Sequence, residues 1–508
     1  MKRNFINNTV TAASALGVLL AWPGLANAED YYVKTRGYRV EPDTDPPSYV
    51  RKLSKTQFEQ FRDIDWLNVG LDHRTRYEYR ENDYRFWTDT TPVGPVKRYR
   101  ADPDNLFLLR TRAYIGIQDI LDPLRFAVEF QNSSSENGLY ERSDSEVNEH
   151  ELIQGYGELY FKNALGFNRP FSIRAGRMAF EVLDRRLVAR NEFRNTTNNF
   201  LGYRVHFGKQ QNDWDLDTFA LQPLERLKYQ WDKNDEDTWF YGGVLSIRRW
   251  SEFITIQPYF MGRKVDGDPT NSVVANRKAD QDIYAPGLRV YGVFPNSSFD
   301  FDADLNKQFG RVGNIAKGTT TQTMQQHDAL AYAIELGYTF DHEWKPRASV
   351  FYGYGTGDKN GVDNNNQRFD AFYGFNQPWS RNDYFSWDNI HAPKARLEFV
   401  PYKEVRVDTG FNAYWLENET AAWNRANLQD RTGKSGSFLG YEWDLRLRHK
   451  LNPYVDWSMS YAYFSPGDFT RAQNGSNPDI GPYTSQPTNF FYFEVTLNAF
   501  GDGKPTYK

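Results

Sequence analysis

The chain has 508 residues, of which 17% are aromatic, a formal net charge of −5 and a mean hydropathy of −0.75. So many rings in so polar a chain favour short alternating segments with aromatic girdles over a thick aliphatic core. Because there is no cysteine, disulfides, thiol nucleophiles, cysteine-ligated zinc and covalently attached c-type haem are excluded.

Residues 1–28 are predicted to be a secretory signal peptide. Two basic residues precede the apolar run 10–20, and the small residues of 26–28 supply a cleavage site. A membrane anchor helix, the alternative, needs about 20 apolar residues, and the break at Pro23-Gly24 leaves too few. The sequence therefore indicates export, and no later apolar stretch is long enough to form an inner-membrane helix.

Residues 29–65 are predicted to be an irregular periplasmic leader, since the acidic, Pro-rich patch 41–47 does not support a regular element. Within this leader, the stretch 50–61 fits a short helix. Such a helix could plug the periplasmic mouth of a channel or hang beside it, and the sequence leaves both alternatives open.

From Leu67 onward the sequence alternates between apolar and charged side chains with a period of two. In the segment 439–448, for example, Tyr441 and Trp443 alternate with Glu442 and Asp444. A half-buried strand of a soluble protein alternates in the same way, whereas a membrane barrel turns the apolar face to lipid and the charged face to a lumen. The choice depends on how often the pattern recurs.

The alternation recurs in 18 segments, an even number, as expected for a bacterial barrel with both ends on the periplasmic side. The predicted strands lie near 67–80, 107–118, 125–131, 150–162, 170–178, 200–209, 213–226, 237–250, 252–263, 283–294, 297–310, 327–341, 345–357, 391–400, 404–418, 436–450, 454–466 and 489–500.

The predicted connections alternate between short and long. Short ones occur at 122–123, 340–344, 401–403 and 452–453, and long polar ones at 81–104, 134–148, 266–281, 358–389, 417–435 and 465–488. We therefore predict an all-β fold, a single transmembrane antiparallel up-and-down β-barrel over 66–500, with short periplasmic turns and long extracellular loops. A C-terminal tail, 501–508, follows it.

The inward face of the predicted barrel carries charges of both signs. In barrels of roughly 16 to 18 strands the lumen is aqueous, and facing rows of charge then select solutes. The alternative for any one residue is a solvated cross-strand pair worth less than about 1 kcal/mol. The candidate pore-lining and solute-guiding residues are Arg74, Arg76, Arg110, Arg112, Arg174, Arg204, Arg396, Arg406, Glu442, Asp444, Arg446 and Arg448.

Two groups of side chains could bind a cation. Asp358, Asn360 and Asp363 place oxygen ligands around a Gly, which is compatible with calcium, although Asx-turns explain the same residues. Asp300, Asp302 and Asp304 share one face and need cationic partners, for which lumen Arg residues or a divalent cation are the candidates.

One further pair could support catalysis. His73 lies beside the hydroxyl of Thr75 on the predicted lipid face, as in a membrane lipase, but no third group accompanies it. The sequence therefore predicts no enzyme and no cofactor.

Two motifs resemble a known family. The run Gly440-Tyr441-Glu442-Trp443-Asp444, followed by Phe464-Ser465-Pro466-Gly467-Asp468, resembles the G-x-E-x-D and F-x-P-G-D pattern of alginate-export outer-membrane porins. The segments 71–79, 174–177 and 355–358 are similar to further parts of that pattern. The resemblance implies an 18-stranded barrel in a Gram-negative outer membrane, with an Arg-rich constriction that passes an anionic polysaccharide. The matching positions are Arg74, Arg112, Arg174, Asp444 and Arg446.

Two features depart from the family. Acids nearly equal bases on the inward face, and Phe500 falls out of phase with the last strand and is followed by eight residues, which implies a bulge or an altered assembly signal.

We predict a channel that passes an anionic polysaccharide or other anionic organic solutes by passive diffusion. The alternatives are a weakly selective porin for small nutrients and a structural sheath that docks periplasmic partners. The expected partners are outer-membrane lipid and lipopolysaccharide, the solute and periplasmic export proteins, with no nucleic acid.

Overall fold

The computed structural model describes residues 45–91, 94–100, 102–166, 168–251, 253–270, 278–315, 320–361, 363–473, 485–502 and 507. The predicted signal peptide and residues 29–44 of the predicted leader lie outside the described residues.

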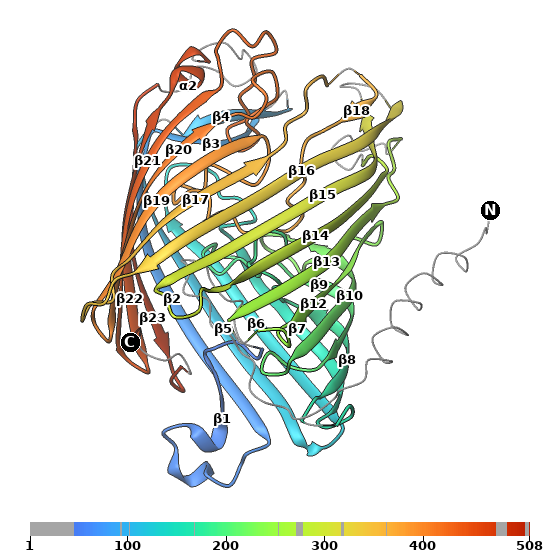
Figure 1. Ribbon diagram of the computed structural model, residues 1–508, viewed down its shortest axis with the longest axis vertical. Helices are drawn as coiled ribbons and strands as arrows, with labels where there is room; N and C mark the ends of the chain where they lie inside the picture. Colours follow the sequence, from blue (N-terminus) through green and yellow to red (C-terminus); the bar gives the residue numbers. More distant parts are fainter. Residues whose placement is uncertain are drawn as a thin grey trace, which may run out of the picture.

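Eighteen antiparallel strands form a closed barrel, as the sequence predicts (Figure 1). β23 pairs with β2 from Asn498 opposite Asp72 to Asn489 opposite Glu81, and this pairing closes the cylinder. The barrel strands are β2 (Leu67–Glu81), β5 (Asp104–Leu121), β6 (Leu124–Asn137), β7 (Asn148–Phe161), β8 (Phe171–Met178), β9 (Phe200–Phe207), β10 (Trp214–Glu225), β12 (Thr238–Ile247), β13 (Ile254–Val265), β14 (Gln281–Val293), β15 (Phe299–Ile315), β16 (Gln322–Thr339), β17 (Arg347–Gly355), β19 (Ile390–Tyr402), β20 (Val405–Trp415), β21 (Phe438–Asn452), β22 (Val455–Pro466) and β23 (Thr488–Asn498).

The remaining described elements are not among the 18 strands that close the barrel, although β1, β11 and β18 pair with the ends of barrel strands. At the end with short turns are β1 (Val50–Lys52) and the 3-10 turns Leu53–Lys55 and Glu59–Phe61. Near the long loops are the hairpin of β3 (Asp83–Thr91) and β4 (Gly94–Arg100), the two-residue strands β11 (Lys233–Asn234) and β18 (Asn365–Asn366), and α2 (Asp468–Ala472). No helix among the described residues combines the length and the apolar character that crossing a bilayer requires.

The period of two sorts the side chains of each strand between the outside and the inside of the barrel. In β21, Tyr441 and Trp443 are exposed on the outside, whereas Glu442 and Asp444 point inward and are buried. Leu439 departs from the prediction that it shares the lipid face, because it is buried. It has no partner on β20, where Gly440 pairs with Tyr414 and Phe438 with Trp415, so a bulge at Gly440 (φ 146°) turns it inward.

Two connections fold into the barrel instead of staying outside it. Inner loop 1 (residues 179–199) joins β8 to β9, and inner loop 2 (residues 367–389) is the second half of the connection from β17 to β19. Their apolar side chains, such as Leu187 and Trp387, are buried in one cluster with inward-facing wall residues such as Phe240. The predicted open aqueous lumen is therefore partly filled, because these rings are removed from water only by packing on the wall.

The two inner loops also bond to each other. The amide of Ala189 donates to the carbonyl of Tyr373 at 3.1 Å, and the amide of Tyr373 donates to the carbonyl of Leu187 at 3.0 Å. The prediction that 358–389 is wholly an external loop is thus wrong for its second half. A polar loop composition does not reveal where the Trp and Phe residues within it will pack.

The leader and the tail meet at the closing seam. β1 pairs with β2 through Val50 and Gly70. The helix predicted for 50–61 is wrong, since this stretch consists of β1 and the two 3-10 turns. Arg51 donates to the carbonyl of Asp502 at 2.6 Å.

Phe500 lies beyond the end of β23 and packs edge-on against Phe58 at 6.1 Å between ring centroids. Phe500 is therefore not part of the alternation of β23, which is why it is out of phase with that strand.

Candidate functional site

Four of the predicted guanidinium groups gather on two neighbouring strands. Arg74 and Arg76 on β2 and Arg110 and Arg112 on β5 all point inward, and each side chain is buried. The pairing of β2 with β5 sets Arg74 directly opposite Arg110. Cations so close together repel each other unless anions or carbonyl dipoles lie among them.

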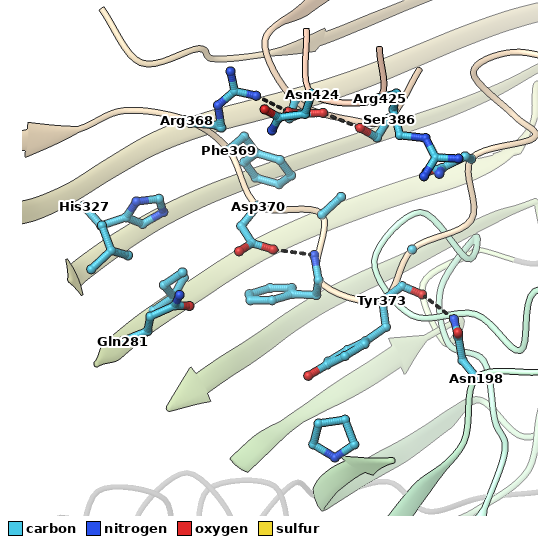
Figure 2. Close-up of a pocket in the computed structure, with 18 of the residues that line it drawn as sticks. Asn198, Gln281, His327, Arg368, Phe369, Asp370, Tyr373, Ser386, Asn424 and Arg425 are labelled. Atoms are coloured by element: carbon cyan, nitrogen blue, oxygen red, sulfur yellow. Dashed lines mark hydrogen bonds and ion pairs between the residues drawn. The ribbon is translucent and has the colours of Figure 1, made fainter. Parts of the chain in front are cut away.

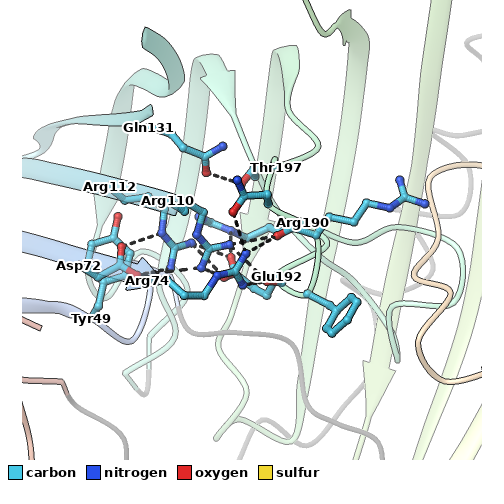
Figure 3. Close-up of polar contacts among 12 residues, drawn as sticks. Tyr49, Asp72, Arg74, Arg110, Arg112, Gln131, Arg190, Glu192 and Thr197 are labelled. Carbon is cyan, nitrogen blue, oxygen red and sulfur yellow. Dashed lines mark hydrogen bonds and ion pairs between the residues drawn. The ribbon is translucent and has the colours of Figure 1, made fainter. Parts of the chain in front are cut away.

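Inner loop 1 supplies both kinds of compensation (Figure 3). The carboxylate of Glu192 accepts from Arg112 at 2.8 Å and from Arg110 at 3.2 Å, and it lies 3.4 Å from Arg190 of the same loop. Burial alone would raise the pKa of Glu192, but Arg112, Arg110 and Arg190 outweigh it and hold the pKa well below its ordinary value. Glu192 is therefore a charged occupant of this arginine cluster, which comprises Arg74, Arg76, Arg110, Arg112 and Arg190.

Backbone carbonyls complete the cluster. Arg74 donates to the carbonyls of Glu192 and Arg194, both at 2.8 Å, and Arg76 donates to the carbonyl of Phe193 at 2.7 Å. These residues were predicted to guide solutes; the structure places them inside the barrel, where they hold inner loop 1. Their role toward solutes stays a prediction.

Arg174 on β8 and Arg204 on β9 form a second pair farther around the wall. Arg174 lies 3.2 Å from Glu158, and Arg204 lies 2.7 Å from Asp217. Both also contact Asp45 of the leader, at 2.8 Å and 3.2 Å. A carboxylate from outside the barrel wall thus reaches this pair.

The remaining predicted residues gather on β19, β20 and β21. Asp408 lies 2.7 Å from Arg396, 3.1 Å from Arg446 and 3.2 Å from Arg448. Arg406 pairs with Glu398 at 2.6 Å. Asp408 is the group that draws these cations together, a role that alternation on a single strand does not reveal.

Glu442 and Asp444 are tied to inner loop 2. Glu442 accepts from the hydroxyl of Ser380 at 2.6 Å and from the amide of Arg381 at 2.7 Å. Asp444 lies 3.7 Å from Arg396 and 3.9 Å from Arg381. Both side chains are buried beneath the loop, so in this structure they anchor it.

Above the inner loops a vestibule of about 870 Å³ opens among the long loops. Arg194, Arg226, Arg368 and Arg425 line it together with Asp370 and the rings of Phe369 and Tyr373. Figure 2 shows the stretch of inner loop 2 that carries Phe369, Asp370 and Tyr373 running between Gln281 and His327 on the wall and Asn198 of inner loop 1. The vestibule thus combines cations with an aromatic surface.

Three of these arginines have carboxylate partners. Arg226 lies 3.2 Å from Asp144, Arg368 pairs with Asp388 and Arg425 with Asp383. Within the part of the chain that the structure describes, the guanidinium of Arg194 has neither an ion pair nor a hydrogen bond.

Burial, together with the neighbouring Arg425 and Arg226, lowers the pKa of Arg194 to about 10 against the opposing effect of Asp383. Arg194 therefore stays charged at neutral pH. It is a cation that direct contacts do not neutralise, and sequence reasoning missed it because it lies on a loop without alternation.

The three aspartates of β15 find different partners. Asp300 pairs with Arg347 at 2.6 Å and Asp302 with Arg289 at 2.7 Å, as predicted for lumen arginines. Asp304 instead accepts from the hydroxyl of Tyr259 at 2.7 Å. Arginines of nearby wall strands thus neutralise Asp300 and Asp302, whereas Asp304 is bonded to a neutral hydroxyl.

The calcium and catalytic candidates have local partners. Asp358 accepts from the amide of Gln367, and Asp363 accepts from the amide of Asn365. No group of three or more His, Asp or Glu residues in the described ranges could hold a metal ion, and calcium at Asp358, Asn360 and Asp363 stays a prediction. His73 lies between the hydroxyls of Thr111 (2.8 Å) and Thr75 (3.1 Å).

The fold is shared with outer-membrane proteins of known structure. Acinetobacter baumannii OccAB1 superposes with a TM-score of 0.53 at 12% identity, covering 85% of this chain and 96% of that one. Pseudomonas aeruginosa OprD, an outer membrane protein, gives 0.50 at 11% identity and covers 92% and 97%. No curated protein matches the sequence.

The alginate export family model matches residues 65–480, most of the chain. That family and the structural relatives are channels of the outer membrane, and the described barrel has the same number of strands. The protein is therefore an outer-membrane channel that belongs to the alginate export family.

Proposed function

We propose that this channel passes small anionic organic solutes, of which a carboxylated sugar such as glucuronate is an example. The observation that carries the proposal is Arg194, the vestibule cation without a direct partner among the described residues. A carboxylate entering the vestibule can pair with this guanidinium in bidentate fashion without displacing an internal anion.

The surroundings of Arg194 favour a ring-shaped anion over a bare ion. Phe372 and Tyr373 line the same vestibule, are only partly buried and offer apolar faces on which a sugar ring can lie. Below them, the inner loops are held across the lumen by buried ion pairs. This arrangement favours a small solute over a polymer, because a polysaccharide chain needs both loops to move aside.

Weakly selective passage of small nutrients is the second candidate function. It is favoured by Glu225 and Asp358, carboxylates that line the same vestibule, make no ion pair with any residue that the structure describes and so attract cations. With both signs present, the balance between Arg194 and these acids decides the selectivity.

The reversal potential of single channels in a planar bilayer under a KCl gradient tests the proposal. We expect anion preference for the wild type and a decrease in current on addition of glucuronate. Arg194→Gln should lower the anion-to-cation permeability ratio by a factor of about 2–5, as expected for one partly solvated charge worth about 0.4–1 kcal/mol.

Arg431→Gln is the matched control, because Arg431 is an exposed arginine of another external loop and does not line the vestibule. It should leave the permeability ratio unchanged. Cation preference of the wild type, or equal effects of the two substitutions, would contradict anion passage and support weakly selective diffusion.

A further inference from the structure

The leader enters the barrel from the end with short turns and brings a carboxylate into its interior. Asp45 lies 2.8 Å from Arg174 and 3.2 Å from Arg204, two guanidinium groups on neighbouring strands. Each guanidinium keeps a second carboxylate of the wall, Glu158 or Asp217. Asp45 is therefore bound by the pair of arginines as a small carboxylate solute would be.

A second contact holds the segment in place. The hydroxyl of Tyr49 donates to Glu129 at 2.6 Å, and the ring of Tyr49 lies 4.6 Å beneath the guanidinium of Arg112. A Cβ atom on Gly70 would lie 2.8 Å from this ring, so the close approach of the segment requires glycine there. Segment 45–49 is thus fitted to the inner wall next to the arginine cluster.

Asp45 is the most accessible of the carboxylates at this site. Its side chain is 38% exposed, whereas those of Glu158 and Asp217 are each 10% exposed. Burial alone would raise the pKa of Asp45, but Arg174, Arg204 and Arg190 lower it to about 2, so Asp45 is charged at neutral pH. A charged, accessible and tethered carboxylate can exchange with a free one at little cost in desolvation.

We propose that Arg174 and Arg204 form a carboxylate-binding site in the lumen, that Asp45 is its built-in occupant, and that an anionic solute competes with Asp45 and releases segment 45–49. The inference rests on the proposed passage of anionic solutes. It adds a site distinct from the vestibule and a reason for the leader to occupy the lumen.

Thiol accessibility tests this proposal without measuring conduction. The native chain has no cysteine, so Ser48→Cys in the purified full-length protein introduces a single thiol within the segment. Its rate of reaction with a water-soluble maleimide is measured with and without glucuronate at constant ionic strength. We expect glucuronate to accelerate the reaction by up to about tenfold, with saturation, and uncharged glucose to have no effect.

Two further substitutions in the Ser48→Cys background identify the occupant. In Asp45→Asn the introduced thiol should react with the maleimide at the fast rate even without glucuronate. Adding glucuronate should then not increase this rate further. Asp63→Asn removes the same charge from an exposed position of the same leader and should behave as the parent.

Either of two results would overturn the proposal: a parent rate that does not respond to glucuronate, or an Asp45→Asn variant that remains slow. The reversal-potential measurement tests the proposed function separately, because cation preference there would contradict anion passage. The two tests are independent because Arg194 makes no hydrogen bond or ion pair with the described segment 45–49.

Discussion

At the scale of single residues, the charges inside the barrel act first on the protein's own loops. The carboxylate of Glu192 pairs with three arginines, and the backbone carbonyls of Glu192 and Phe193 accept hydrogen bonds from two more. A buried cluster of guanidinium groups is stable only with such partners. The same guanidinium groups that were predicted to guide a solute therefore hold inner loop 1 in place.

Glu192→Gln should lower the free energy of unfolding by about 1.5–3 kcal/mol, since hydrogen bonds to charged groups are lost while Arg110 and Arg112 stay buried. Urea unfolding in lipid vesicles, followed by tryptophan fluorescence, measures the change. Glu419→Gln removes an exposed carboxylate of an external loop and should change the value by less than about 0.5 kcal/mol.

The effect of Glu192 should also depend on pH. Because its pKa is lower in the folded state than in the unfolded state, its stabilising effect is complete above the unfolded value of about 4.5 and decreases as the pH falls below it. The difference in stability between wild type and Glu192→Gln should therefore be constant from about pH 6 to 8 and shrink below about pH 4.5. A difference that grows on acidification would contradict the assignment.

At the scale of elements, inner loop 2 is held by small residues on the wall. Ala331 and Ala333 on β16 are fully buried, and Gly353 on β17 faces Trp379 so closely that a Cβ atom would lie 2.2 Å from its ring. Small side chains at these wall positions thus leave the space that inner loop 2 occupies.

Gly353→Ala should push Trp379 away and loosen inner loop 2. Overpacking of this kind typically costs about 1–3 kcal/mol, so the population with the loop displaced should rise by about 5- to 150-fold. Single-channel recordings should show a larger mean conductance or frequent openings. In Gly157→Ala the new Cβ atom makes only ordinary contacts, 3.5 Å and 3.7 Å from the ring of Phe126, and the conductance should equal that of the wild type.

The sequence predicts the barrel strands well because their signal is local. Alternation of Tyr441 and Trp443 with Glu442 and Asp444 is complete within one strand, and the structure confirms it there. The partners of the inward charges are not local. Arg112 meets Glu192 80 residues away, and Glu442 meets Ser380 62 residues away. No period or composition within a segment encodes such contacts, which is why inner loop 2 is predicted to lie outside.

At the scale of the whole molecule, both ends of the described chain secure the closing seam. Asp502 pairs with Lys450 at 2.7 Å, its amide donates to Pro453 at 2.7 Å, and its carbonyl accepts from Arg51. The leader, the tail and the turn between β21 and β22 thus meet at one residue next to the strands that close the cylinder.

Asp502→Asn should lower the thermal stability of the barrel, because Lys450 is left buried without its carboxylate, at a cost of about 1–3 kcal/mol. The temperature at which the folded band is lost in a gel-shift assay measures this change. Asp468→Asn is the control, since Asp468 is 88% exposed. Equal temperatures for the two variants would show that the tail does not secure the seam.

The contact between the inner loops gives the barrel a mechanical property. Glu192 connects inner loop 1 to β5, and the carboxylate of Asp370 connects inner loop 2 to Arg263 on β13. The side-chain amide of Gln308 on β15 donates to the backbone carbonyl of Asp370 at 2.7 Å and accepts from its backbone amide at 2.9 Å. β13 and β15 lie about half-way around the cylinder from β2 and β5. Because backbone hydrogen bonds at Ala189 and Tyr373 join the two loops, they form a continuous connection between opposite sides of the barrel. A barrel connected in this way resists flattening under the lateral pressure of the bilayer.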